Sequence, residues 1–160
     1  MLKLIILSFL LILLLALISK IFNTFEEYRL KGLRNDPKLK ELKRVFDGFF
    51  NQERYWEKPL DMLNNRRISE EVNLYKGDKS YTINKENIFL CLKDENKKYY
   101  ENNLLIYVLA HEYAHTLSKS IGHTEEFHNI FEALLVELAD SNIYNPNLNP
   151  EQDLLVHEEK

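Results

Sequence analysis

An apolar run at the start of the chain constrains its fold more than any other feature. The first 22 residues carry only two charged side chains, Lys3 and Lys20, and are otherwise almost wholly aliphatic. At ~1.5 Å per residue, a helix over residues 4–22 would be about 28 Å long, just enough to cross the hydrocarbon core of a bilayer. We therefore predict a transmembrane signal-anchor at residues 1–22.

A cleaved signal peptide is the alternative for this segment. Cleavage requires small residues one and three positions before the cut, and the triplets at 16–18 and 18–20 are poor sites. The sequence therefore favours a retained anchor and a single-pass membrane protein. Basic residues after the apolar run outnumber Lys3 before it, which predicts a domain on the cytoplasmic side. These basic residues are Lys20, Arg29, Lys31 and Arg34.

The rest of the chain has the composition of one acidic globular domain. Without Lys3 and Lys20 it carries 19 basic against 25 acidic side chains, a net charge of −6. A domain of this charge has no general attraction to nucleic acid, so we expect no direct nucleic-acid binding. Cys91 is the single cysteine, which excludes an intrachain disulfide framework. Metal ligands, if there are any, must come from histidine and carboxylate side chains.

The chain after the anchor divides into three predicted parts. We expect a juxtamembrane tether at residues 23–35, a folded domain at residues 36–144 and a polar tail at residues 145–160. The domain begins with Asp36 as a helix N-cap and a proline at the first helical position. Apolar residues follow at helical spacing as far as Phe49, which predicts an amphipathic helix.

A small sheet is expected next. Residues 72–75 and 80–83 favour strands and flank a turn that contains Gly77, and a compact β-prone run follows at residues 88–92. These patterns predict three strands of a small antiparallel sheet.

Two helices complete the predicted domain. Asn102 or Asn103 is the predicted cap of the first helix, apolar residues at helical spacing follow as far as Leu117, and Gly122 is the expected end of this helix. Thr124 can cap a second helix, which has a broad apolar face. The predicted fold is therefore α+β, with the small antiparallel sheet packed on these helices and an N-terminal transmembrane helix before it.

The first of these two helices contains His111-Glu112-Tyr113-Ala114-His115, a match to H-E-x-x-H. Residues four apart lie on one face of a helix, so both imidazoles can reach one tetrahedral metal. Glu112 would take a proton from a zinc-bound water and pass it to the leaving amine. We therefore predict Zn²⁺ as the cofactor, His111 and His115 as ligands, and Glu112 as the catalytic residue.

A third ligand is required, because catalytic zinc usually has three protein ligands and one open position. His123 is the best candidate, since Gly122 before it can take the left-handed conformation that turns the chain back toward the metal. His128 and Glu137 are rivals, but a packing histidine and a solvated glutamate are simpler interpretations of these two residues. His157, in the predicted tail, is not a candidate.

These elements resemble a known family. H-E-x-x-H, followed by Gly122-His123-Thr124-Glu125-Glu126-Phe127 and an apolar helix, is similar to the WLM and SprT-like zincin metallopeptidases with their downstream G-H-x-x-x-F element. The predicted strand at residues 88–94 and the lead-in to the helix at residues 103–109 are similar to small membrane-anchored members found in large DNA viruses. The resemblance covers residues 81–144.

The resemblance implies a minimal zincin metallopeptidase domain with protein or peptide substrates. Glu112 would be its general base and acid, and the strand at residues 88–92 would border the cleft and pair with the substrate backbone. The domain would face the cytoplasm or the interior of a virion. DNA–protein crosslink repair by larger relatives is not carried over, because this domain is acidic and has no apparent DNA-binding appendage. The implied zinc ligands are His111, His115 and His123.

Two other classes of protein stay open. A catalytically silent, zinc-stapled membrane or virion structural protein would not need Glu112, and its metal site would more often be closed by a fourth ligand. An anchored adaptor would carry H-E-x-x-H by coincidence, which the aligned third histidine disfavours. The sequence selects neither an oligomeric state nor an oxyanion donor. Tyrosines that could serve as oxyanion donors are Tyr99, Tyr100, Tyr107, Tyr113 and Tyr144.

Overall fold

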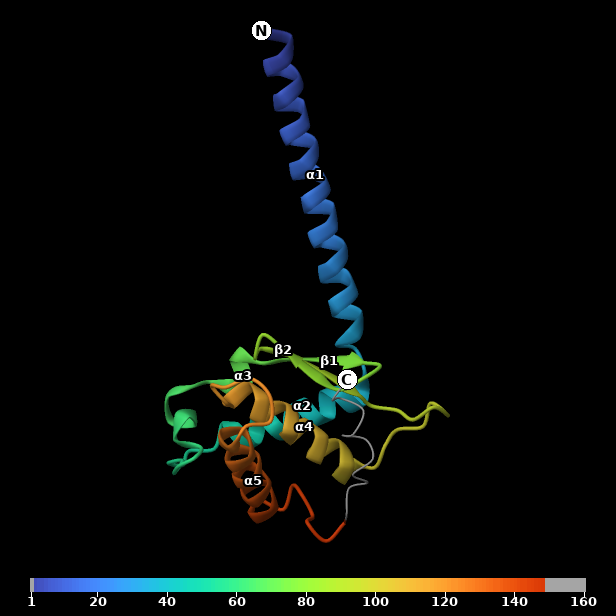
Figure 1. The fold of residues 1–160 in the computed structure, drawn as a ribbon. Helices are drawn as coiled ribbons and strands as arrows, with labels where there is room; N and C mark the ends of the chain where they lie inside the picture. The colour runs from blue at the N-terminus through green and yellow to red at the C-terminus, as the bar shows by residue number, and fades with distance from the viewer. Residues whose placement is uncertain (1, 149–160) are drawn as a thin grey trace. The chain divides into compact units, whose positions relative to one another are not determined.

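The computed structural model describes residues 2–148 and divides the chain after Asn35 into two units, Met1–Asn35 and Asp36–Lys160 (Figure 1). The first unit is one continuous helix, α1 (Leu2–Leu33), which covers both the predicted anchor and most of the tether. Large apolar side chains from Leu7 to Phe25 are exposed along it. Among the described residues, this helix is the one that is long and apolar enough to cross a membrane.

The second unit begins as its capping signals predict. α2 (Pro37–Phe50) has proline in its first turn, and the Asp36 carboxylate accepts hydrogen bonds from the backbone N–H groups of Lys38 at 2.9 Å and Leu39 at 3.4 Å. These bonds satisfy donors that the helix itself cannot use. The short helices η1 (Asp61–Asn65) and α3 (Ile68–Glu71) then lead into the sheet.

The sheet is mixed rather than antiparallel, so the predicted topology is wrong. Its strands are β1 (Asn73–Gly77), β2 (Tyr81–Ile83) and β3 (Asn87–Cys91), in the order β1-β3-β2. β3 pairs with β1 in parallel and with β2 antiparallel. The expected hairpin around the glycine turn does not form, because β1 and β2 do not pair with each other.

A tight turn between β2 and β3 explains this order. Asn84 and Lys85 have φ angles of +53° and +58°, and the Glu86 N–H bonds to the Ile83 carbonyl at 3.2 Å. Two central residues with positive φ are characteristic of a type I′ hairpin turn, whose twist matches that of the strands. β2 therefore folds directly onto β3, and β1 is left to pair with the other edge of β3.

Helix α4 (Asn102–Leu117) is the centre of this unit. It contacts β2 and β3 on one side and α5 (Glu125–Asp140) on another (Figure 1). Most of its side chains are buried, as is typical of a helix that is apolar on nearly all sides. The α+β class with an N-terminal apolar helix is thus observed.

Both predicted ends of α4 differ from the structure. The helix begins at Asn102, with Glu101 and neither asparagine at the N-cap position, and its predicted C-terminal end is five residues too late. The helix stops at Leu117, where Ser118 turns to an extended conformation, while Gly122 adopts φ +81° further along the loop. The predicted cap of α5 is confirmed, because the Thr124 hydroxyl accepts a hydrogen bond from the Phe127 N–H. Residues 149–160 of the predicted tail lie outside the described residues.

Candidate metal site

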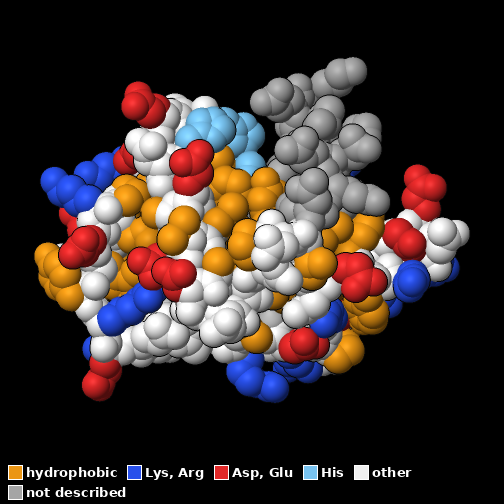
Figure 2. All heavy atoms as spheres, turned by 90° about the horizontal axis from the view of Figure 1, so that it is seen from below, with side chains coloured by type: hydrophobic (Ala, Val, Ile, Leu, Met, Phe, Trp, Pro, Cys, Tyr) orange, Lys and Arg blue, Asp and Glu red, His pale blue; other side chains and the backbone are white. Residues whose placement is uncertain are grey.

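Three histidines from two segments converge at the end of α4. The Nε2 atom of His111 lies 3.2 Å from Nε2 of His115 and 3.1 Å from Nε2 of His123. His111 is buried, His115 is half-buried and His123 is exposed, and all three ligand atoms lie within 4.8 Å of one another. Histidine side chains gather accordingly at one place on the surface (Figure 2). Within residues 2–148, this is the group of three side chains close enough together to share one metal ion.

The distances from the His111 nitrogen to the ring nitrogens of His115 and His123 suit ligands of a tetrahedral metal. Zn–N bonds of ~2.0–2.1 Å at tetrahedral angles separate two ligand nitrogens by about 3.3 Å. The two separations measured from His111 are close to this value. The sequence brings His111 and His115 together by helical periodicity, whereas Gly122 with its positive φ turns the chain so that His123 reaches the same point.

The electrostatic surroundings keep the buried rings neutral. Burial, with the neighbouring rings of His115, His123 and His128, lowers the pKa of His111 from 6.5 to about 3. Burial, His123 and the Lys85 ammonium lower the pKa of His115 to about 4. A metal binds the neutral imidazole, so both rings have the protonation state of a ligand at neutral pH.

Glu112 lies beside the histidines and is fully buried. The Thr82 hydroxyl on β2 donates to its Oε2 atom at 2.6 Å, and Thr116 donates to its backbone carbonyl at 3.2 Å. Glu112 also lines a cavity of about 550 Å³ together with His115 and His123. The carboxylate is therefore oriented by the edge strand and faces the same space as the candidate ligands.

The two rival ligands do not join this group. Glu137 forms an ion pair with Arg54, whose Nη1 lies 2.8 Å from its carboxylate. His128 is exposed on α5, with its ring 6.3 Å from that of His123. His157 lies outside the described residues.

Among the described residues, those that line the cavity beside the histidines include none of the five tyrosines considered as oxyanion donors. Tyr99 donates to the Asp36 carboxylate at the start of α2. Tyr107 and Tyr144 pack against each other. Tyr113 is buried in the core, and burial raises the pKa of its hydroxyl. Tyr100 lines a different cavity.

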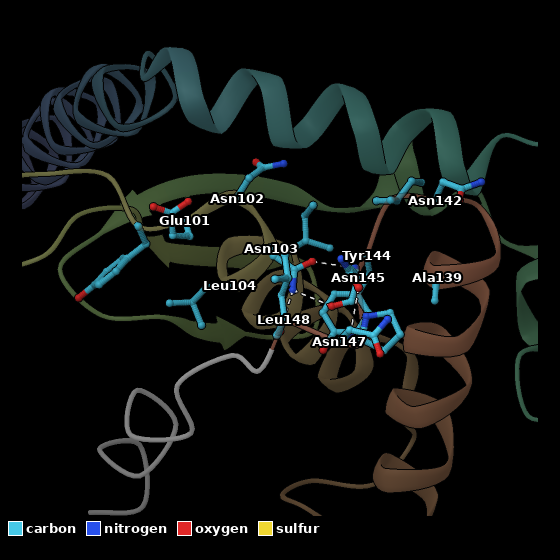
Figure 3. Close-up of a pocket in the computed structure, with 14 residues that line it drawn as sticks. Glu101, Asn102, Asn103, Leu104, Ala139, Asn142, Tyr144, Asn145, Asn147 and Leu148 are labelled. Atoms are coloured by element: carbon cyan, nitrogen blue, oxygen red, sulfur yellow. Dashed lines mark hydrogen bonds between the residues drawn. The ribbon is translucent and has the colours of Figure 1, made fainter.

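That different cavity, of about 1150 Å³, lies at the start of α4 (Figure 3). Asn103 crosses it: the side-chain amide donates to the carbonyls of Asn145 at 3.0 Å and Leu148 at 3.1 Å, and accepts from the Asn145 N–H at 2.8 Å. These polar groups satisfy one another. These hydrogen bonds hold the segment after α5 against α4. None of the candidate metal ligands lines this cavity.

Several residues of the histidine cavity were not found from the sequence. Thr82, Tyr81, Lys85 and Ile121 all line it. Asn84-Lys85 between two β-prone runs is a signal for a tight turn, but no local pattern indicates which helix that turn approaches.

The strand next to the site also differs from the implied one. β3, which covers most of residues 88–92, is the central strand, and both its edges are paired within the sheet. It therefore has no edge available for a substrate backbone. β2 is the edge strand on the side of Glu112.

Comparison with known proteins finds relatives in viruses. The chain is 47% identical over 89 residues to the uncharacterized protein 136R of Invertebrate iridescent virus 6, covering 54% of this chain and 50% of that protein. It is 40% identical over 89 residues to the uncharacterized protein 042R of Invertebrate iridescent virus 3, covering 55% and 56%. The match to the uncharacterized protein R325 of Acanthamoeba polyphaga mimivirus is 34% identical over 92 residues, covering 53% and 46%.

The chain spans about half the length of the curated relatives it matches. No family model matches it, and no solved structure matches it. The similarity to WLM and SprT-like zincins therefore stays a prediction, whereas the similarity to viral proteins is observed.

Proposed function

We propose that this protein is a membrane-anchored, zinc-dependent metallopeptidase of the WLM/SprT-like zincin type. The observation that carries the proposal is the convergence of the Nε2 atoms of His111, His115 and His123 beside the buried carboxylate of Glu112. Three nitrogen ligands leave one coordination position for chemistry, as in catalytic zinc sites.

The residues of the site divide the chemistry between them. Bound zinc supplies Lewis acidity, which makes water nucleophilic near neutral pH and polarises the scissile carbonyl. Glu112 accepts the proton of the attacking water and delivers it to the leaving amine. Thr82 holds the carboxylate in place through its 2.6 Å hydrogen bond, so the proton acceptor is oriented before the substrate binds.

The substrate is a protein or peptide segment in extended conformation. β2 has one edge paired with β3, so its other edge is available to backbone hydrogen bonds from an added strand. Because Thr82 on this strand contacts Glu112, a substrate paired there would run past the candidate metal site. The β2 edge thus takes the role that the family resemblance implies for the strand at residues 88–92.

A catalytically silent, zinc-stapled structural protein is supported less well. Among the described residues the candidate ligands number three, without a fourth to close the site. A purely structural site would also have no use for Glu112, a buried carboxylate held by a hydrogen bond beside the ligands. The proposed enzyme faces the cytoplasm or the virion interior, as the basic residues after the apolar run indicate.

Zinc binding and catalysis can be tested separately in the full-length chain in detergent. We expect one zinc per chain, with severe loss of affinity in His111→Ala, His115→Ala and His123→Ala. His128→Ala is the matched control, because this exposed histidine lies outside the cluster, and it should retain zinc. Zinc retention by His123→Ala together with loss in Glu137→Ala would overturn the ligand assignment.

Glu112→Gln then separates the enzyme from the structural protein. The substitution keeps the size of the side chain and removes the base, so zinc content should stay near wild type while turnover falls by about 10²–10⁴-fold. Turnover is measured as autolysis or as cleavage of an unfolded test protein, with a chelator as control. Cleavage by Glu112→Gln at the wild-type rate would contradict the proposed mechanism.

A further inference from the structure

The loop before His123 is held by charged side chains on two sides. The Lys85 ammonium donates to the carbonyls of Ser118, Lys119 at 2.8 Å and Ser120 at 3.0 Å. From the start of α5, the Glu126 carboxylate accepts the backbone N–H groups of Lys119 at 3.2 Å and Ser120 at 3.0 Å. We call residues 118–120 the clamped loop.

The chemistry of Lys85 matches what it binds. An ammonium group has three donors and no acceptor, and each of its hydrogens can meet one of the three carbonyls. These carbonyls follow the C-terminus of α4, where unpaired carbonyl groups carry partial negative charge. Lys85 therefore binds the segment directly after the helix that bears His111 and His115, although it comes from a hairpin about thirty residues earlier.

The backbone at Lys85 is unusual for this residue type. Its φ of +58° lies in the left-handed region, which lysine adopts at a cost and glycine adopts freely. Glycine is the preferred residue at this position of a type I′ turn. Lys85 adopts this unfavourable backbone conformation, and its ammonium group makes three hydrogen bonds. The combination indicates that lysine occupies this position because of its side chain and not because of the turn.

The clamp restricts the segment that carries His123. Ser120 Oγ is 2.6 Å from Thr124 Oγ1, the N-cap of α5, so both ends of the segment are fixed. Between these ends lie Ile121, Gly122 and His123, with Gly122 at φ +81°. Fixing the clamped loop therefore sets where the His123 ring can reach.

We propose that Lys85 is a positioning residue for the metal site: by holding the clamped loop it places His123 against His111 and His115. This inference rests on the proposed zinc site. Lys85 binds only backbone carbonyls of the loop in these contacts, so it acts through His123 and not as a ligand.

The direction in which zinc affinity changes when the Lys85 ammonium is removed distinguishes a positioning role from a purely electrostatic one. A positive charge near the site repels a zinc ion, so if charge alone mattered, removing the ammonium would strengthen zinc binding. If Lys85 positions His123, removing it weakens zinc binding. Loss of a group that orients a metal ligand typically lowers affinity by about 10–100-fold.

The test measures zinc affinity of the full-length chain in detergent by competition with a chromophoric chelator. We expect Lys85→Met to lower the affinity about 10–100-fold. Lys119→Met is the matched control: it removes the same charge from an exposed side chain of the clamped loop, which uses its backbone N–H and carbonyl in the clamp. The zinc affinity of Lys119→Met should equal that of the wild-type protein.

A double-mutant cycle tests whether the effect passes through His123. In the His123→Ala background, Lys85→Met should cause no further loss of affinity. An equal loss in that background, or unchanged or tighter zinc binding by Lys85→Met alone, would overturn the inference. If Lys85→Met does not fold, judged by circular dichroism, the neutral and shorter Lys85→Gln replaces it with the same expectations. A wild-type chain that takes up no zinc would instead overturn the proposed function itself.

Discussion

The protonation of His111 and His115 links the candidate site to the stability of the fold. Both rings have pKa values below that of an ordinary histidine, chiefly because burial disfavours their charged forms. In the unfolded chain each ring titrates near 6.5, so below that pH the unfolded state binds protons that the folded state does not bind until about pH 4 to 3. Acid therefore favours unfolding in this window.

We expect the metal-free protein to lose stability between pH 7 and pH 5. His111, which is 6% exposed, should lower the free energy of unfolding by about 2 kcal/mol over this interval, because its folded form stays neutral while its unfolded form takes up a proton. Urea unfolding followed by the fluorescence of Trp56, the single tryptophan, measures the change. His111→Gln is the control, and a pH dependence as steep as that of wild type in this variant would contradict the assignment.

Helix α4 carries both the candidate ligands and the main packing contacts of the second unit. One residue after Glu112, the ring of Tyr113 stacks on Phe46 of α2 with centroids 5.1 Å apart and planes 13° apart, and Phe50 meets it edge-on at 4.9 Å. Tyr113 is two residues from both His111 and His115, so in a helix of 3.6 residues per turn its side chain lies on nearly the opposite side of α4 from the histidines.

One substitution in α2 and one in α4 should change the free energy of unfolding by different amounts. Phe46→Ala opens a cavity beside Tyr113 and should lower the free energy of unfolding by about 3–5 kcal/mol. Tyr113→Phe keeps the ring and removes a buried hydroxyl that has no hydrogen-bond partner among the described residues, so it should cost nothing or stabilise by about 1 kcal/mol. Urea unfolding monitored at Trp56 compares them. Strong destabilisation by Tyr113→Phe would show that its hydroxyl has a partner.

The two units of the chain differ in whether their apolar side chains are buried or exposed. The second unit buries an apolar core of its own, whereas α1 exposes its large apolar side chains from Leu7 to Phe25. Exposed apolar area on this scale is unfavourable in water and favourable in hydrocarbon. The chain therefore combines a unit that has a buried apolar core with a helix that is long and apolar enough to cross a membrane.

The full-length protein should remain in the membrane fraction after alkaline carbonate extraction, with residues 1–22 still attached. The expectation follows from the length and apolarity of α1 and from the poor cleavage sites within it. Immunoblotting of the fractions and N-terminal sequencing measure it. Recovery of a soluble protein that begins near Lys20 would rule out the anchor, and protection of the domain inside sealed microsomes would reverse its predicted orientation.

Much of the local structure follows from the order of the residues alone. Asp36 with Pro37, and Thr124 before an apolar helix, start helices where the sequence predicts them, because capping depends on side chains within three residues of the backbone groups they bind. His111 and His115 share a face because helical periodicity is local as well. The sequence also predicts that His123 lies near these two histidines, because Gly122 indicates a reversal of the chain, and the structure places it there.

Tertiary structure alone decided the rest. β1 and β2 are close in sequence but lie on opposite edges of β3, because strand pairing depends on contacts between distant segments and β-prone runs do not specify their partners. The same reason hid Thr82 and Lys85, which meet α4 only after the β2–β3 hairpin has formed. Residue order thus specified most of the helices and the shared face of His111 and His115, and long-range packing determined which strand borders the histidines and which side chains hold the loop before His123.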